Sequence, residues 1–106
     1  MSAVQCELRV IPHCPHATPA LELFRGALAA EAMDGAVQVV EVVDGQGAVA
    51  LMFRGSPSFI ADGRDLFPSS APPGFACRVY PTAEGPAGLP SLQDLKAALR
   101  SVETRR

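Results

Sequence analysis

Two strand patterns with a helix pattern between them occupy the first 43 residues, and this order restricts the fold more than any other feature. In residues 4–11, VQCELRVI, apolar and polar side chains alternate, which is typical of a strand with one buried face. Residues 18–33 carry apolar side chains at helical spacing, and residues 36–43, AVQVVEVV, form a β-branched run that predicts a buried strand. Such a β-α-β unit predicts two parallel strands joined by a right-handed crossover.

The remaining patterns are shorter. Residues 47–55 suit a short helix, and residues 56–65 and 77–80 predict two further strands, with no helix between them. We therefore expect the last two strands to pair antiparallel. A final helix pattern follows Ser91, a suitable N-cap with Asp94 three residues later.

The resulting order, β-α-β-(α)-β-β-α, predicts an α/β fold with a mixed four-stranded sheet flanked by helices. A chain of 106 residues fits one domain, so we assign residues 1–106 to it. The net charge of −2 provides no basic surface for nucleic acid, and no apolar run approaches the length of a membrane span. Because no secretion signal is recognisable, we expect a cytoplasmic protein that binds neither nucleic acid nor membrane.

The stretch VIPHCPHATPA, residues 10–20, places Cys14 between His13 and His16, directly after a strand pattern. If a helix begins here, its free backbone N–H groups favour a thiolate, and Pro15 suits the first helical position. Histidines add positive charge when protonated, which favours the thiolate further. The stretch therefore predicts a reactive, nucleophilic cysteine at Cys14.

Two short motifs resemble those of the thioredoxin superfamily, and the element order fits that family from about Val4 to Val102. Residues 14–16, CPH, are similar to the start of the Cys-Pro-His-Cys motif of its strongly oxidising members. Residues 55–59, GSPSF, are similar to the loop in which a cis proline faces the active-site cysteine. The resemblance implies a thioredoxin-like fold in which Pro57 lies across the site from the cysteine.

One position departs from the motif, because Ala17 stands where the second cysteine would be. The resemblance then implies monothiol redox or thiol-transfer chemistry at Cys14, acting on glutathione, another thiol or a protein disulfide, with no cofactor. His16 would tune the thiolate and His13 would assist it. If Pro57 is cis, the backbone groups of its loop, with Ser56 as a supporting residue, would pair with an extended peptide or with glutathione like an added strand.

The other two cysteines are expected to be structural. Cys6 lies on the apolar side of its strand pattern and predicts a core side chain. Cys77 is a possible second thiol. In a thioredoxin-like order, however, its strand would begin at the end away from Cys14, beyond the Cα separation of about 7 Å that a disulfide tolerates. The loop of residues 62–76 could change this path.

A different class of function is soft-metal binding. His13, Cys14 and His16 are ligands suited to zinc, copper(I) or mercury(II), but no second ligand cluster follows, so we assign no metal site. A third class is a binding module that has kept the fold and lost catalysis. Its small apolar groove would be lined by some of four phenylalanines, most of which we expect in the core: Phe53, Phe59, Phe67 and Phe75.

The stretches FRGSPSFIADGRDLF, CRVY and AGLPSLQDLKAAL are also similar to small bacterial thioredoxin-like proteins, some of them described as related to alkylmercury lyases. An organomercurial lyase, as that resemblance implies, needs a cysteine pair and an acid that protonates the carbon leaving group. Cys14 and Cys77 with Asp62 or Asp65 are the conceivable set. If they do not serve as the acid of a lyase, Asp62 and Asp65 are expected to lie in a solvated turn.

Overall fold

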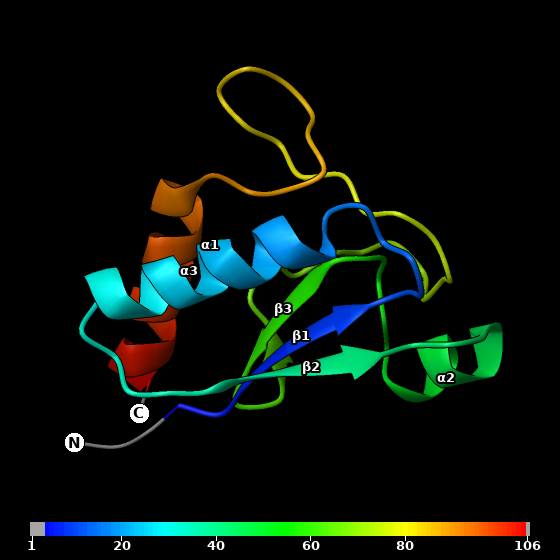
Figure 1. Ribbon diagram of the computed structural model, residues 1–106, viewed down its shortest axis with the longest axis horizontal. Helices are drawn as coiled ribbons and strands as arrows, with labels where there is room; N and C mark the ends of the chain where they lie inside the picture. The colour runs from blue at the N-terminus through cyan, green and yellow to red at the C-terminus, as the bar shows by residue number, and fades with distance from the viewer. Residues whose placement is uncertain (1–3, 106) are drawn as a thin grey trace.

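A mixed β-sheet with two helices packed on one face forms the body of the protein (Figure 1). The computed structural model describes residues 4–105, and no helix in that range is long and apolar enough to cross a membrane. The predicted α/β fold with a mixed four-stranded sheet is confirmed. In chain order the elements are β1 (Cys6–Val10), α1 (Ala17–Ala30), β2 (Val37–Glu41), α2 (Gly45–Ala50), β3 (Ser58–Ala61), β4 (Arg64–Asp65) and α3 (Leu92–Arg105).

The strands lie in the order β2-β1-β3-β4. β1 is parallel to β2, as the β-α-β pattern predicted, whereas β3 runs antiparallel to both β1 and β4. Leu8, at the middle of β1, pairs with Val39 on one side and Phe59 on the other. Asp62 and Gly63 make the tight turn between β3 and β4 with positive φ angles of 51° and 79°, which an Asp-Gly pair tolerates well.

Alternate side chains of β1 point into the main core between the sheet and the two long helices. Cys6 and Leu8 are buried there, as the alternation predicted. Phe24 of α1 is fully buried, and its ring meets that of Phe59 edge-on with the centroids 5.3 Å apart. Leu95 of α3 is also fully buried. Each such side chain stabilises the fold by about 1.5–3 kcal/mol, so the core fixes β1 and α1 firmly at either side of their connecting turn.

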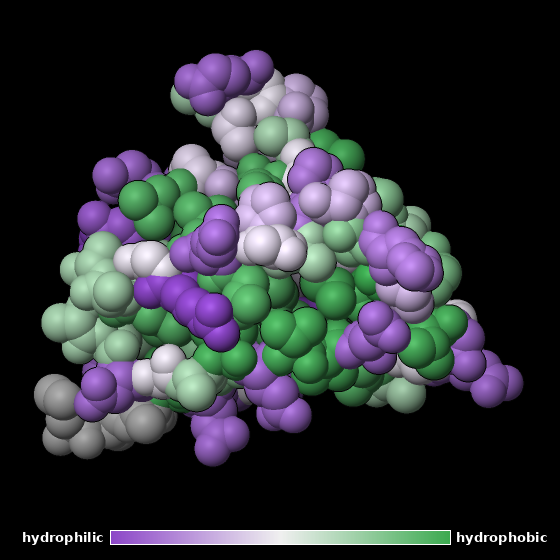
Figure 2. Space-filling model, in the orientation of Figure 1, coloured by the Kyte–Doolittle hydropathy of each residue, from purple (hydrophilic) through white to green (hydrophobic). Residues whose placement is uncertain are grey.

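The second strand is more exposed than its sequence predicted. β2 lies at the edge of the sheet and pairs only with β1, so its β-branched run reflects strand propensity and not burial on both faces. Val39 is 49% exposed, although Val37 packs against the main core. Apolar side chains accordingly show at the surface on the face seen in Figure 2, below α1 and over the strands.

The strand expected at residues 77–80 is not a regular strand. Cys77 forms an isolated parallel bridge with Ser56, and Tyr80 forms an antiparallel one with Ala87. Because the two residues pair with different segments, no continuous ladder develops, and the fourth strand of the sheet is β4 instead.

Helices α2 and α3 each begin directly after a residue whose side chain caps the helix. α2 begins after Asp44, whose Oδ1 accepts a hydrogen bond from the backbone of Gly47 at 2.7 Å, so this helix starts earlier and is shorter than the predicted span of 47–55. α3 begins after Ser91, whose Oγ accepts from the backbone of Asp94 at 3.1 Å. The predicted cap of the last helix is therefore confirmed.

Candidate functional site

Two consecutive turns hold Cys14 between β1 and α1. The backbone N–H of Cys14 donates to the carbonyl of Ile11 at 3.3 Å, and the backbone N–H of Ala17 donates to the carbonyl of Cys14 at 3.2 Å. His13 adopts the left-handed conformation with a φ of 60°, which histidine tolerates better than most residues. The Cys14 side chain is partly buried against the main core, while His13 is exposed.

The helix begins later than the Cys14 interpretation required. α1 starts at Ala17 with His16 as its N-cap, and the His16 side chain makes no capping hydrogen bond. Pro15 therefore precedes the helix and does not fill its first position. Pro15 lies instead in the turn closed by the hydrogen bond from Ala17 N–H to the Cys14 carbonyl, and the first i+4 helical bond runs from Ala20 N–H to the His16 carbonyl at 2.8 Å. Pro19 lies in the first turn instead, where its missing N–H costs nothing.

A side-chain hydrogen bond joins the Cys14 turn to residues 55–59, GSPSF, which we call the proline loop. The Oγ of Ser56 accepts from the backbone N–H of Ile11 at 3.0 Å, and Ser56 is fully buried. The peptide bond between Ser56 and Pro57 is cis, which is the isomer that the resemblance implies. The structure thus joins Ile11, in the turn that leads into CPH, to Ser56 of the GSPSF motif.

The backbone of Ser56 is already paired within the chain. Its N–H donates to the carbonyl of Ala76 at 2.8 Å, and its carbonyl accepts from the N–H of Arg78 at 2.9 Å. Residues 76–78 therefore occupy the place beside Pro57 where we expected an added strand from a partner. The segment reaches this position because residues 66–76 run back past β3, with the N–H of Gly74 bonded to the carbonyl of Phe53 at 3.0 Å.

This pairing places Cys77 next to the proline loop, so the expectation that its segment starts at the far end was wrong. Cys77 is exposed and is the bridge partner of Ser56. The long connection of residues 62–76, and not the hairpin geometry of β3 and β4, determines where it lies. Cys6, in contrast, is buried in the core as predicted.

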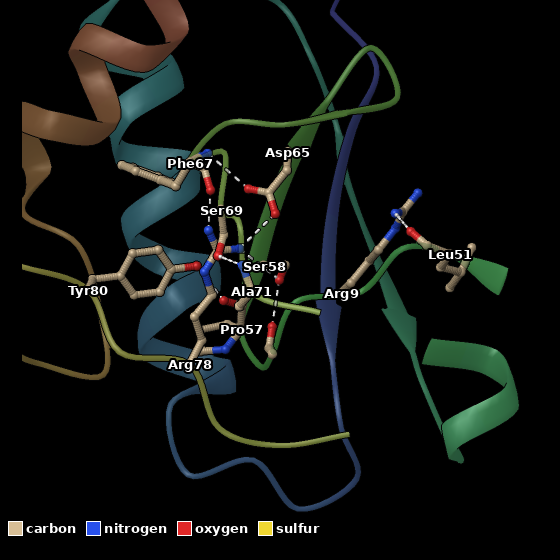
Figure 3. Close-up of polar contacts among 11 residues, drawn as sticks. Arg9, Leu51, Pro57, Ser58, Asp65, Phe67, Ser69, Ala71, Arg78 and Tyr80 are labelled. Atoms are coloured by element: carbon tan, nitrogen blue, oxygen red, sulfur yellow. Dashed lines mark hydrogen bonds and ion pairs between the residues drawn. The ribbon is translucent and has the colours of Figure 1, made fainter. Parts of the chain in front are cut away.

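A buried arginine lies behind the proline loop, and the sequence analysis did not identify it (Figure 3). Arg78 is 9% exposed; its Nη1 donates to Asp65 Oδ2 at 2.7 Å and to Ser58 Oγ at 3.2 Å, and its Nη2 donates to the carbonyl of Phe67. The expectation of a solvated turn at Asp65 was therefore wrong. A charge taken out of water needs a partner, and the burial of Arg78 requires this carboxylate. An arginine within the apolar run CRVY was the available signal.

Tyr80 completes this network from the same segment. Its hydroxyl donates to the carbonyl of Pro57 at 2.5 Å, and the Arg78 guanidinium lies 4.8 Å from the centre of its ring (Figure 3). Burial raises the pKa of Tyr80. The positive charge of Arg78 opposes this rise, and the negative charge of Asp65 adds to it. Because Ser58 Oγ also donates to the carbonyl of Gly55 at 2.5 Å, the carbonyls of residues 55, 56 and 57 are all bonded within the chain.

The imidazole of His16 lies against the backbone of a later loop. A Cβ atom added at Gly88 would lie 2.7 Å from Cδ2 and 2.9 Å from Cε1 of His16, closer than real carbon atoms approach. Two backbone hydrogen bonds between Tyr80 and Ala87, of 2.7 and 2.9 Å, hold this loop in place. With the ring in this position a side chain at residue 88 would overlap it, and nothing in the local sequence indicated this contact.

The phenylalanines do not build a common groove beside Cys14. Phe53 and Phe59 are buried in the core, and Phe75 is exposed. Phe67 packs edge-on against Tyr80, with the ring centroids 5.2 Å apart, and together with Arg78 and Tyr80 it lines an open pocket of about 510 Å³.

Within residues 4–105, no three side chains of histidine, cysteine, aspartate or glutamate gather where they could hold one metal ion. Both acids of the conceivable lyase set are engaged: Asp62 Oδ1 accepts from the backbone of Gln5 at 3.1 Å, and both oxygens of Asp65 accept hydrogen bonds.

The site belongs to an α/β protein with one partly buried cysteine turn held against a cis-proline loop. No family model, curated protein or solved structure matches the chain.

Proposed function

We propose that this chain is a thioredoxin-like protein whose Cys14 thiol carries out thiol–disulfide exchange with a disulfide or a low-molecular-weight thiol. The hydrogen bond from Ile11 to Ser56 Oγ carries the proposal, because it fixes the cysteine turn against the loop that contains the cis Ser56–Pro57 bond. The strand order β2-β1-β3-β4, with one parallel and two antiparallel pairs, supports the same fold family.

The chemistry needs only one nucleophile on the protein. The thiolate of Cys14 attacks one sulfur of a disulfide, a mixed disulfide forms at Cys14, and the other sulfur leaves as a thiolate. His13 is exposed and His16 is partly buried, one and two residues from Cys14, so either imidazolium can donate a proton to the leaving group. A second thiol then attacks the mixed disulfide and releases Cys14.

The pairing around Ser56 supports a small partner. Both backbone groups of Ser56 are bonded to residues 76–78, so an extended protein segment would have to displace that chain to pair there. A small disulfide has only to reach the Cys14 sulfur. We therefore infer that glutathione or a similar thiol is the better partner, which fits a cytoplasmic protein because the cytosolic thiol pool is largely glutathione.

Intact-protein and peptide mass spectrometry after mixing the reduced protein with glutathione disulfide tests this proposal. We expect Cys14 to become disulfide-bonded, first as a glutathione adduct, in the wild type and in Cys6→Ala, which removes a buried thiol, and no bond at that position in Cys14→Ser. A wild-type protein whose Cys14 forms neither a glutathione adduct nor any other disulfide would rule out the proposed reaction. Stoichiometric mercury(II) binding that depends on Cys14, without any adduct, would favour the soft-metal function instead.

A further inference from the structure

Within residues 4–105 the cysteines form no disulfide, and Cys14 and Cys77 belong to segments that meet at one residue. Ser56 accepts the hydrogen bond of Ile11 with its side chain, and it binds residues 76 and 78 with its backbone. The turn that carries Cys14 and the segment that carries Cys77 are therefore held to the same buried anchor. We propose that Cys77 is the resolving thiol of this protein and forms an intramolecular disulfide with Cys14.

The burial pattern of the segment turns Cys77 outward. Arg78 and Tyr80 are 9% and 2% exposed and point into the network behind the proline loop, whereas Val79 is 65% exposed. In extended chain successive side chains point to opposite faces, so the anchoring of Arg78 places the Cys77 thiol on the other side, at the surface. An exposed thiol is free to react with a partner sulfur, which a buried one such as Cys6 is not.

The pairing also sets the face on which Cys77 lies. Ser56 and Cys77 are direct partners in a parallel bridge, and side chains of directly paired residues share one face. The Ser56 side chain points to the turn between β1 and α1, because its Oγ reaches the N–H of Ile11. Cys77 is therefore presented on the side of the Cys14 turn, and the segment of residues 66–80 runs back toward that turn (Figure 1).

The reaction balances with a low-molecular-weight disulfide as oxidant. The Cys14 thiolate attacks this disulfide, so one of its thiols leaves and the other stays bound to Cys14. The Cys77 thiolate then attacks the Cys14 sulfur, the protein disulfide forms, and the second thiol leaves. Overall, two protein thiols lose two electrons and two protons, and one small disulfide is reduced to two thiols. Cys77 thus supplies the sulfur that Ala17 does not.

The role of Cys77 rests on the proposed reactivity of Cys14, and one experiment tests the two proposals separately. Reduced wild type, Cys77→Ser and Cys6→Ala are mixed with glutathione disulfide, quenched with acid at intervals and digested without reduction. An intramolecular thiol acts at an effective concentration of roughly millimolar, so at micromolar glutathione we expect the wild-type adduct to disappear at least about tenfold faster than that of Cys77→Ser. The wild type should end with a Cys14–Cys77 peptide pair and a mass lower by two hydrogen atoms.

The matched variant Cys6→Ala should behave as the wild type, because Cys6 is buried in the core. An adduct on Cys14 that accumulates equally in the wild type and in Cys77→Ser, with no linked peptide pair, overturns the role of Cys77 and leaves the proposed function standing. If Cys14 forms neither an adduct nor a disulfide, both proposals fail. An unchanged urea midpoint of Cys77→Ser shows that this variant is folded, so that a difference from the wild type reports the loss of the Cys77 thiol alone.

Discussion

Ser56 Oγ accepts the backbone N–H of Ile11 at 3.0 Å, and this bond fastens the turn that carries Cys14 to the proline loop. Ser56→Ala would leave that N–H without its acceptor. A lost hydrogen bond of this kind costs about 1–2 kcal/mol of unfolding free energy, and the turn would lose its fixed position. We expect a lower urea midpoint and a changed rate of Cys14 alkylation, measured by timed labelling with iodoacetamide and mass spectrometry.

Ser69→Ala is the matched control for this change. Ser69 is exposed and its Oγ accepts only a local hydrogen bond from Ala71, so its removal should change the unfolding free energy by less than about 0.5 kcal/mol. Equal behaviour of Ser56→Ala and Ser69→Ala in both measurements would show that the bond to Ile11 does not hold the site together.

The ion pair between Asp65 and Arg78 is expected to be important for stability. Asp65→Asn keeps an acceptor for the backbone of Phe67 but leaves the buried guanidinium without its counter-charge. Breaking a buried pair costs roughly 3–5 kcal/mol, and because the Asp65 side chain is 21% exposed we expect about 2–3 kcal/mol by urea denaturation. Glu31→Gln, which breaks the more exposed pair with Arg100, should cost under about 1 kcal/mol. Similar losses in the two variants would contradict the structural role assigned to Arg78.

Local patterns in the sequence were sufficient to predict most of the fold. The alternation around Leu8, the apolar spacing around Phe24 and the cap at Ser91 each reflect interactions within a few residues of the chain, and each was found as predicted. The exposure of Val39 was not predictable in this way, because it depends on β2 being at the edge of the sheet. A β-branched run favours a strand in either place, so it does not by itself distinguish an edge strand from a central one.

The candidate site was predictable only in part, for a similar reason. Cys14 and Pro57 stand in motifs that can be found in the sequence. The positions of Cys77 and Arg78 depend on the path of residues 66–76, which contains no regular element and is fixed by single tertiary hydrogen bonds. No periodicity in the sequence indicates such a path. Cys77, which was expected far from the site, was therefore found with its backbone paired to Ser56.

The buried hydroxyl of Tyr80 predicts a loss of stability at high pH. Burial raises the pKa of Tyr80 above its ordinary value near 10, so the unfolded chain loses this proton at a lower pH than the folded protein does. Stability is therefore unaffected by this group below about pH 10 and falls above it, by up to about 1.4 kcal/mol per pH unit. Tyr80→Phe should show a shallower fall in urea midpoint between about pH 9.5 and 11, since other titrating groups are common to both proteins. An equally steep fall in the urea midpoint of the wild type and of Tyr80→Phe would show that the buried Tyr80 hydroxyl does not cause the loss of stability.

The contact between His16 and Gly88 predicts that one added methyl group will move the imidazole. In Gly88→Ala the new Cβ would overlap the His16 ring, which can swing away because it is the end of a flexible side chain. We expect a loss of less than about 1 kcal/mol of stability, together with shifted imidazole resonances of His16 in NMR spectra and a changed rate of Cys14 alkylation. Gly74→Ala is the matched control, because a Cβ there has nothing within 4 Å and should leave all three measurements unchanged. If Gly88→Ala moves the His16 resonances but not the alkylation rate, His16 has no part in the reactivity of Cys14. If the resonances do not move either, the imidazole does not lie against Gly88.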